Sequence, residues 1–264
     1  MPPAVIAFDL DGTLIRPDKT IHPRDVEILS GGNHPILIPV TARTLYSVKK
    51  CFQRHGVLSG DTISFPVATQ YGSVLYGNNE RLVHSRCFSI ETAHQLLDVM
   101  KGFPLVTSWL YTPDEVFTLN SNKFSEQVGE EFDFALTPLR DDLVFAFTKA
   151  TALSPDLSEL ERFFQAIGTL ECNASYYRPS LIEIRPQGVD KGNGLQRLIQ
   201  ELGISRPLVF VAGDNAFDLP MFVVADRSYA PTTASPEVRD AASRIVDVDK
   251  NGLLEPALTD LGQL

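Results

Sequence analysis

Residues 4–13 read Ala4-Val5-Ile6-Ala7-Phe8-Asp9-Leu10-Asp11-Gly12-Thr13, a short apolar run that leads directly into two carboxylates, a glycine and a hydroxyl. The run has the length of a buried strand, and an ionised carboxylate at the end of such a strand loses hydration unless a cation or hydrogen-bond donors compensate for it. An ordinary β-turn would also place Asp and Gly here. Two neighbouring carboxylates favour a Mg²⁺ site, because this ion prefers oxygen ligands and is typically held by carboxylates plus a substrate phosphate.

Apolar, strand-like runs alternate with amphipathic, helix-like segments on both sides of a different middle region. This alternation is typical of a parallel sheet built from β-α-β units. In the middle region, neighbouring strand candidates stand beside two or three helix candidates, which indicates an α+β module. We therefore predict an α/β fold with a Rossmann-like, doubly wound, mostly parallel sheet in residues 1–81 and 185–264. Residues 82–184 are expected to form an inserted α+β cap domain.

The same patterns predict the individual elements that surround the expected site. Strands are expected over residues 5–8, 35–40, 63–69, 143–148 and 208–212. Helices are expected over residues 189–202 and 218–224.

Composition narrows the classes of partner. The 264 residues carry a formal net charge of -10, whereas affinity for a nucleic-acid backbone requires clustered Lys and Arg. The N-terminal apolar run is too short for a signal peptide or a membrane span. The cysteines, Cys51, Cys87 and Cys172, lack C-x-x-C spacing, which favours reduced thiols. We expect a cytoplasmic monomer or weak homodimer that binds neither nucleic acid nor membranes.

Three further segments place polar residues where strands end or helices begin. Thr41-Ala42-Arg43 follows a predicted strand, and its hydroxyl and guanidinium suit phosphate oxygens, although a helix N-cap with an exposed Arg fits the same residues. Lys191 stands in the first turn of a predicted helix, where the macrodipole disfavours a cation. That placement is explained if Lys191 faces Asp9 and a phosphate, and the alternative is a solvated surface lysine. Gly213–Asp218 follows another apolar strand, and ligands of open α/β sheets bind at such strand ends.

Together these segments resemble the motifs of the haloacid dehalogenase (HAD) superfamily, in the order found in that family. Residues 9–13 match its DxDGT motif completely. In the family the first Asp is the nucleophile that becomes a phosphoaspartate, and the second is the acid/base. The resemblance therefore assigns these roles to Asp9 and Asp11, and Lys191 is similar to the lysine of the family's KG motif.

The resemblance also implies a ligand set. Asp9, Asp11 and Asp214 would bind the metal. Thr13 and Asp218 would contact these ligands without binding the metal themselves. The implied phosphate contacts are Thr41, Ala42, Arg43, Lys191 and Asn215. The sequence departs from the family at Phe217, where the family usually places an Asn that approaches the phosphate.

The position of the insertion resembles the type IIB group, which includes Cof-type sugar phosphatases. This implies a Mg²⁺-dependent phosphomonoesterase that acts on a small phosphorylated metabolite, with a sugar phosphate as the expected substrate, through a phosphoaspartate on Asp9. A phosphomutase and a catalytically weak HAD-fold binding protein are the alternatives. Cap residues would choose the substrate, and the candidates for contact with its sugar or phosphate are Trp109, Tyr111, Tyr176, Tyr177 and Arg178. The alternative for the four aromatic residues is that they form the core of the cap.

Overall fold

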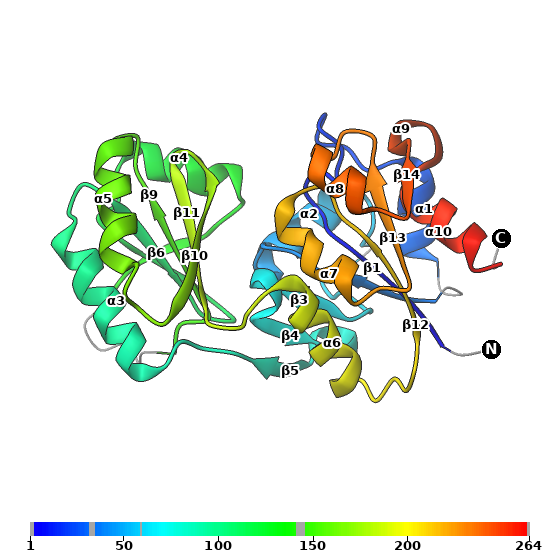
Figure 1. Ribbon diagram of the computed structural model, residues 1–264, viewed down its shortest axis with the longest axis horizontal. Helices are drawn as coiled ribbons and strands as arrows, with labels where there is room; N and C mark the ends of the chain where they lie inside the picture. Colours follow the sequence, from blue (N-terminus) through cyan, green and yellow to red (C-terminus); the bar gives the residue numbers. More distant parts are fainter. Residues whose placement is uncertain (1–2, 32–34, 59, 141–145, 263–264) are drawn as a thin grey trace. The chain divides into compact units, whose positions relative to one another are not determined.

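The computed structural model describes residues 3–31, 35–58, 60–140 and 146–262, and the chain forms two compact units (Figure 1). The first unit comprises Met1–Arg43, Val48–His84 and Asp190–Leu264, and the second comprises Thr44–Ser47 and Ser85–Val189. These limits differ by a few residues from the expected 82–184. A strand that ends at Ser85 pairs within the first unit, and one that ends at Pro186 pairs within the second.

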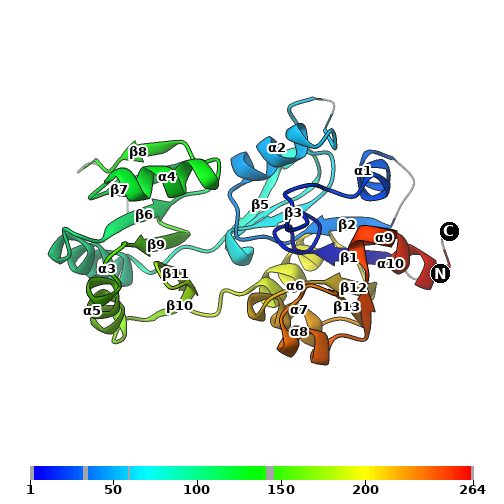
Figure 2. The ribbon, with the colours of Figure 1, turned by 90° about the horizontal axis from the view of Figure 1, so that it is seen from above.

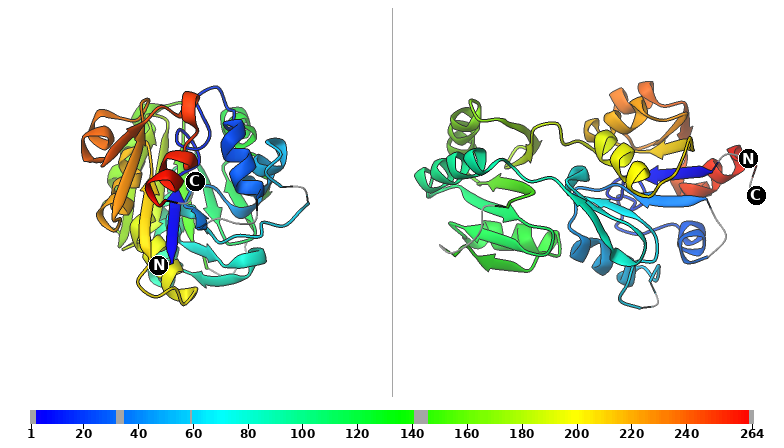
Figure 3. Two further views of the ribbon diagram at one scale, coloured as in Figure 1. Left: turned by 90° about the vertical axis from the view of Figure 1, so that its right-hand side faces the viewer. Right: turned by 90° about the horizontal axis from the view of Figure 1, so that it is seen from below.

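The first unit is built on a five-stranded sheet whose strand pairs are all parallel. Its order is β14-β13-β12-β1-β2, and the right-hand view of Figure 3 shows β1 and β2, in blue, running side by side. The apolar runs are buried, as expected for strands that are covered on both faces. The strands are β1 (Ala4–Phe8), β2 (Ile36–Pro39), β12 (Leu208–Ala212), β13 (Arg227–Pro231) and β14 (Arg244–Val246).

Helices cover both faces of this sheet. Figure 2 shows α6 (Lys191–Glu201), α7 (Leu219–Val223) and α8 (Pro236–Ala241) on one face and α1 (Pro23–Ser30) on the other. Leu195 and Leu198 of α6 pack on buried residues of β1 and β12. The predicted helix 189–202 starts at Lys191 because Asp190 is its N-cap and accepts a hydrogen bond from the Asn193 N–H. The other helices here are α2 (Leu45–Arg54), α9 (Val248–Asn251) and α10 (Leu254–Asp260).

A small antiparallel sheet adjoins the end of β2. Its strands are β3 (Val67–Thr69), β4 (Val74–Tyr76) and β5 (Leu82–Ser85), linked by the 3-10 turns η1 (Gln70–Gly72) and η2 (Asn78–Glu80). The strand predicted over 63–69 is shorter in the structure. Pro66 cannot donate to a strand ladder, and the Ile63 N–H donates instead to the Glu80 carboxylate.

The second unit is a six-stranded, mostly antiparallel sheet with the order β10-β11-β9-β6-β7-β8. Two helices, α3 (Ile90–Gly102) and α5 (Leu157–Ile167), share an apolar core with one face of it. The helix α4 (Lys123–Glu131) contributes to the core of the opposite face. The strands are β6 (Thr107–Tyr111), β7 (Val116–Leu119), β8 (Leu136–Pro138), β9 (Lys149–Leu153), β10 (Cys172–Arg178) and β11 (Leu181–Pro186).

The side chains that the sequence offered as substrate contacts in this unit divide into two groups. Trp109 and Tyr111 are buried in the core beside α4, whereas Tyr176 and Tyr177 are exposed. Arg178 pairs with Glu131. The strand predicted over 143–148 begins at Lys149 in the structure, and residues 141–145 lie outside the described part of the chain.

The predicted α/β fold is confirmed by the parallel sheet and its flanking helices. Among the described residues, no helix has both the length and the apolar character that crossing a membrane requires. The three cysteines are free thiols.

Candidate active site

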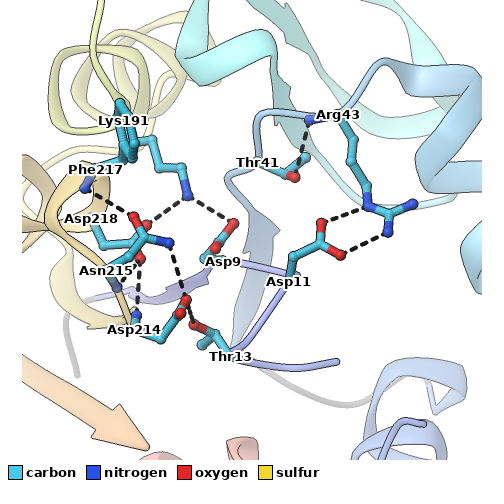
Figure 4. A network of polar contacts seen from close by, with 10 residues as sticks. All are labelled: Asp9, Asp11, Thr13, Thr41, Arg43, Lys191, Asp214, Asn215, Phe217 and Asp218. Atoms are coloured by element: carbon cyan, nitrogen blue, oxygen red, sulfur yellow. Dashed lines mark hydrogen bonds and ion pairs between the residues drawn. The ribbon is translucent and has the colours of Figure 1, made fainter. Parts of the chain in front are cut away.

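Polar residues from four distant parts of the chain meet at the carboxyl ends of the central parallel strands (Figure 4). Asp9 follows β1, the Thr41–Arg43 loop follows β2, and Asp214 follows β12. The N-terminus of α6 adds Lys191. In the parallel sheet, β1 lies between β12 and β2, so the carboxyl ends of these strands lie at one edge and bring the side chains together.

A buried lysine joins two carboxylates at the centre of this group. Lys191 Nζ lies 2.7 Å from Asp9 Oδ1 and 2.6 Å from Asp218 Oδ1. Burial by itself would lower the pKa of Lys191, but the charges of Asp218 and Asp9 outweigh it and hold the pKa above its ordinary value. The Lys191 side chain is only 2 % exposed, which excludes a solvated surface lysine.

Both oxygens of the Asp218 carboxylate are engaged. Oδ1 pairs with Lys191, and Oδ2 accepts hydrogen bonds from the N–H groups of Asp214 and Asn215, at 2.9 and 3.2 Å. Asp218 therefore ties the loop after β12 to the helix that carries Lys191. The supporting role that the family resemblance implies for Asp218 stays a prediction.

Asp214 is oriented by Thr13, a contact across most of the chain. The Thr13 hydroxyl donates to Asp214 Oδ1 at 2.8 Å, and the Asn215 side-chain amide donates to the same oxygen at 3.3 Å. Gly12, which directly follows Asp11, has φ 87°, and a Cβ at this position would overlap the Asp214 carboxylate. Glycine is thus required here both by the backbone conformation and by the close approach of Asp214.

Asp11 faces away from the other carboxylates and forms a two-bond ion pair with Arg43. Arg43 Nε and a terminal guanidinium nitrogen lie 2.7 Å from the two carboxylate oxygens of Asp11. Burial would raise the pKa of Asp11, but the hydrogen bonds and charge of Arg43 outweigh it, so the pKa is lowered. The Thr41 hydroxyl accepts the Arg43 N–H at 3.2 Å, while Thr44 accepts the Ser47 N–H in the first turn of α2.

Asp9, Asp214 and Asp218 each offer one carboxylate oxygen to a group in which these three atoms lie within 4.8 Å of one another. Burial raises the pKa of Asp9 well above its usual range, against the effect of Lys191. Burial and the charge of Asp218 raise the pKa of Asp214 to about 6. Three carboxylates beside one ammonium leave an excess of buried negative charge, and a divalent cation would compensate for it.

Asp9 and Asp214 are the members of this group that could hold a cation. Asp218 already accepts hydrogen bonds on both oxygens. The predicted ligand Asp11 has its carboxylate directed at Arg43 in this structure, so its assignment to the metal stays a prediction.

The predicted phosphate contacts are only partly brought together. Lys191, Thr41 and Arg43 stand around Asp9 and Asp11 (Figure 4). In the sequence, Ala42 lies between Thr41 and Arg43. The Asn215 side chain is engaged within its own loop, where Oδ1 accepts the Phe217 N–H at 2.9 Å. The contribution of Asn215 to phosphate binding stays a prediction.

The sequence patterns did not identify η1 as part of the site. Its backbone N–H groups at Gln70 and Tyr71 donate to the carbonyls of Arg43 and Thr41, which fixes the loop after β2. Its Gly72 packs so closely on α6 that a Cβ would lie 2.7 Å from Gly194 Cα. The signal in the sequence was only the Tyr-Gly pair, which marks a turn without saying what the turn contacts.

The chain is similar in sequence and in fold to known hydrolases. The family model of haloacid dehalogenase-like hydrolases matches residues 6–255. The pyridoxal phosphate phosphatase of Escherichia coli is 27 % identical, over 92 % of this chain and 92 % of its own length. The 5-amino-6-(5-phospho-D-ribitylamino)uracil phosphatase of Bacillus subtilis is 23 % identical, over 94 % of each chain. The solved structure of the HAD subclass IIB sugar phosphatase BT4131 matches with a TM-score of 0.76 and 16 % identity, over 99 % of this chain and 100 % of that one.

The chain belongs to the haloacid dehalogenase-like hydrolases. The prediction that the chain belongs to this family is confirmed, and so is the prediction that it is a phosphatase enzyme.

Proposed function

We propose that this haloacid dehalogenase-like hydrolase is a Mg²⁺-dependent phosphomonoesterase that acts on small phosphorylated metabolites through a phosphoaspartate on Asp9. The observation that carries the proposal is the buried Asp9–Lys191–Asp218 array at the edge of the parallel sheet. It offers a carboxylate nucleophile, a fixed ammonium beside it and an excess of negative charge suited to a cation.

In the first step the Asp9 carboxylate attacks phosphorus. A bond forms between a carboxylate oxygen and phosphorus while the bond from phosphorus to the leaving oxygen breaks. Lys191, held 2.7 Å from Asp9, offsets the charge of the phosphoryl oxygens during this transfer. The Thr41 hydroxyl, which is buried at the end of β2, can donate to one of the same oxygens.

Asp11 supplies and removes the proton in this proposal. Its ion pair with Arg43 favours the ionised form, so Asp11 must exchange that partner before it can act as an acid. We propose that the substrate phosphate draws Arg43 away, because guanidinium binds phosphate oxygens as well as carboxylate. Asp11 then protonates the leaving alcohol, and afterwards takes a proton from the water that attacks phosphorus. This second attack breaks the bond to Asp9 and releases inorganic phosphate.

Asp9 and Asp214 would hold the Mg²⁺, with Thr13 orienting Asp214. The bound ion would neutralise phosphoryl oxygens and help to align the phosphate with Asp9. The second unit, as the proposed cap domain, would contribute to substrate selection.

The substrate class follows from relatives with full-length similarity. One is named for pyridoxal phosphate and another for 5-amino-6-(5-phospho-D-ribitylamino)uracil, and both compounds are phosphate monoesters of small metabolites. We propose the same class for this chain, including sugar phosphates.

The test is release of inorganic phosphate from a panel of hexose phosphates and pyridoxal 5′-phosphate, with Mg²⁺ or with EDTA. We expect metal-dependent turnover of at least one compound and none with Asp9→Asn. A hydroxylamine-labile phosphoryl label on the acid-quenched wild-type protein would report the acyl phosphate directly. Equal turnover by Asp9→Asn, or none by the wild type across the panel, would contradict the proposal.

A further inference from the structure

The turn η1 has an unusual backbone. Gln70, Tyr71 and Gly72 are consecutive residues at positive φ, with values of 52°, 61° and 90°. Glycine adopts this region freely and Asn does so more readily than most residues, whereas a bulky aromatic residue is sterically disfavoured there. The conformation is imposed by the backbone, since the Tyr71 N–H donates to the Thr41 carbonyl at 2.9 Å. The backbone alone would therefore be served better by Gly or Asn at position 71.

The side chain of Tyr71 gives a reason for this costly residue. Its ring is buried, with 1 % of the residue exposed, and lies against the ring of Phe217. The two ring centroids are 5.2 Å apart and the planes are inclined by 46°. Aromatic pairs at this separation attract each other beyond the burial of their surface.

Phe217 belongs to the loop that forms the active site. Its neighbour Asp218 binds Lys191 at 2.6 Å, and its own N–H is fixed by Asn215. The turns η1 and η3 (Ala216–Asp218) both pack on α6, the helix that begins with Lys191. Phe217 is partly exposed. Figure 4 shows it on the same side of the site as Lys191, opposite Arg43.

We propose that Tyr71 and Phe217 form an aromatic wall that makes the site prefer phosphate monoesters with a planar aromatic leaving group over polyhydroxylated ones. The proposal rests on the proposed phosphatase function and names its preferred substrate class. Phe217 contacts the substrate ring, and Tyr71 holds Phe217 from behind. A phenyl ring offers no hydrogen bonds to sugar hydroxyls, whose water would be lost without replacement.

The test compares two phosphonates that cannot be hydrolysed, benzylphosphonate and the dihydroxylated 2,3-dihydroxypropylphosphonate, by calorimetry with Mg²⁺ present. We expect the wild type to bind benzylphosphonate about tenfold more tightly, an advantage in the range of an aromatic contact. Phe217→Leu keeps an apolar side chain without the ring, and should reduce the preference to about threefold or less. A wild type without the preference, or a Phe217→Leu protein that keeps it, would overturn the proposal.

Variants of Tyr71 test the supporting role. Tyr71→Phe keeps the ring and should keep the preference, whereas Tyr71→Asn suits the backbone but removes the ring and should reduce the preference. A reduction in both variants, or in neither, would overturn the role given to the Tyr71 ring. If Tyr71→Asn does not fold, Phe217→Leu still decides the proposal.

Turnover separates this proposal from the function on which it rests. Benzyl phosphate and glucose 6-phosphate are both esters of primary alcohols. A difference between their kcat/KM values therefore reports the contact with the aromatic wall and not the reactivity of the leaving alcohol. Hydrolysis of both esters with equal kcat/KM would contradict the aromatic wall but would still support the proposed phosphatase function. A preference for benzylphosphonate without Mg²⁺-dependent phosphate release from any ester would contradict the proposed phosphatase function. It would still support a binding site for aromatic phosphonates.

Discussion

Each unit of the molecule buries charged side chains, but the two clusters are composed differently. In the first unit, three carboxylates cluster at the end of a parallel sheet, and two of them, Asp9 and Asp218, pair with the Lys191 ammonium. Asp9 and Asp214 have raised pKa values there because burial and neighbouring negative charge disfavour their ionised forms. An additional cation would balance this cluster.

In the second unit, Lys149 and Glu183 form a one-to-one pair on neighbouring strands of the antiparallel sheet. Lys149 Nζ lies 3.1 Å from Glu183 Oε2, and Thr151 donates to the same oxygen at 3.2 Å. The ammonium also lies 4.1 Å from the centroid of the Tyr111 ring, a favourable position for a cation. Burial still lowers the pKa of Lys149, against the effect of Glu183.

The contrast separates two uses of buried charge. A pair of opposite charges whose polar atoms are satisfied by hydrogen bonds has a structural role that apolar residues could take over. A cluster with excess charge of one sign is relieved either by protonation or by a ligand of the opposite sign, and such clusters are candidates for functional sites. The two clusters should therefore respond differently to mutation, to metal and to pH.

The largest expected effect is on the stability of the second unit. Lys149→Met leaves Glu183 buried without its partner, and we expect unfolding free energy to fall by about 3–5 kcal/mol. The double variant Lys149→Met/Glu183→Leu removes both charges and should recover most of this loss in a denaturant titration. Phosphatase activity of the folded double variant should stay within about threefold of the wild type, since a structural pair touches no substrate. A stable double variant without activity would show that this pair also serves the reaction.

Removal of Lys191 should instead reduce catalysis. Lys191→Met takes away the ammonium beside Asp9, and we expect kcat to fall about 100- to 1000-fold, as for loss of one preorganised electrostatic contact. The measurement is steady-state turnover with saturating Mg²⁺, together with a thermal unfolding curve to show that the variant is folded. Lys191→Met/Asp218→Leu, the counterpart of the double variant above, should not recover activity. Recovery of kcat in that protein would mean that Lys191 is needed only to neutralise Asp218.

The sequence predicted the part of the first cluster that local patterns encode. Asp9 and Asp214 each follow a buried strand, and Lys191 opens a helix, so the parallel order of the sheet is sufficient to bring them together. The fold class followed from the same alternation of strands and helices. The oligomeric state and the cytoplasmic location stay predictions.

Side-chain partners were not predictable in the same way. Nothing local to Asp11 indicates that its carboxylate turns to Arg43, because that orientation depends on how the ends of β1 and β2 pack. The role of η1 was missed because it rests on long-range backbone contacts with the loop after β2. The Lys149–Glu183 pair was missed for a related reason, since it depends on the register between β9 and β11. Local sequence specifies which groups are near a site, and tertiary packing specifies their partners.

Metal binding should depend on pH only through the first cluster. The pKa of Asp214 in the folded protein is about 6, above that of an unfolded Asp, so its protonation favours the folded metal-free protein at low pH. This contribution is lost as pH rises through about 6, where the ionised carboxylate becomes available to Mg²⁺. Protonation of Asp214 by itself should make the apparent Mg²⁺ affinity about tenfold weaker at one pH unit below this pKa than well above it.

The measurement is the increase in Tm on addition of a fixed concentration of Mg²⁺, at pH values on either side of the Asp214 pKa. The increase should be larger at the higher pH and should be lost in Asp214→Asn. The double variant at Lys149 and Glu183 should show the wild-type response. An equal increase at both pH values would place the ion away from Asp214.

The smallest expected effect concerns the hydrogen bond behind the proposed metal ligand. Thr13 is buried and donates to Asp214 Oδ1 at 2.8 Å, so Thr13→Val removes the donor with little change in volume. A net loss of about 1 kcal/mol, typical of one hydrogen bond, corresponds to about fivefold weaker Mg²⁺ activation. Thr13→Ser keeps the hydroxyl and should keep the wild-type activation curve. Because saturating Mg²⁺ restores an oriented Asp214, kcat of Thr13→Val should return to the wild-type value; a kcat that stays low would assign Thr13 a direct part in the reaction.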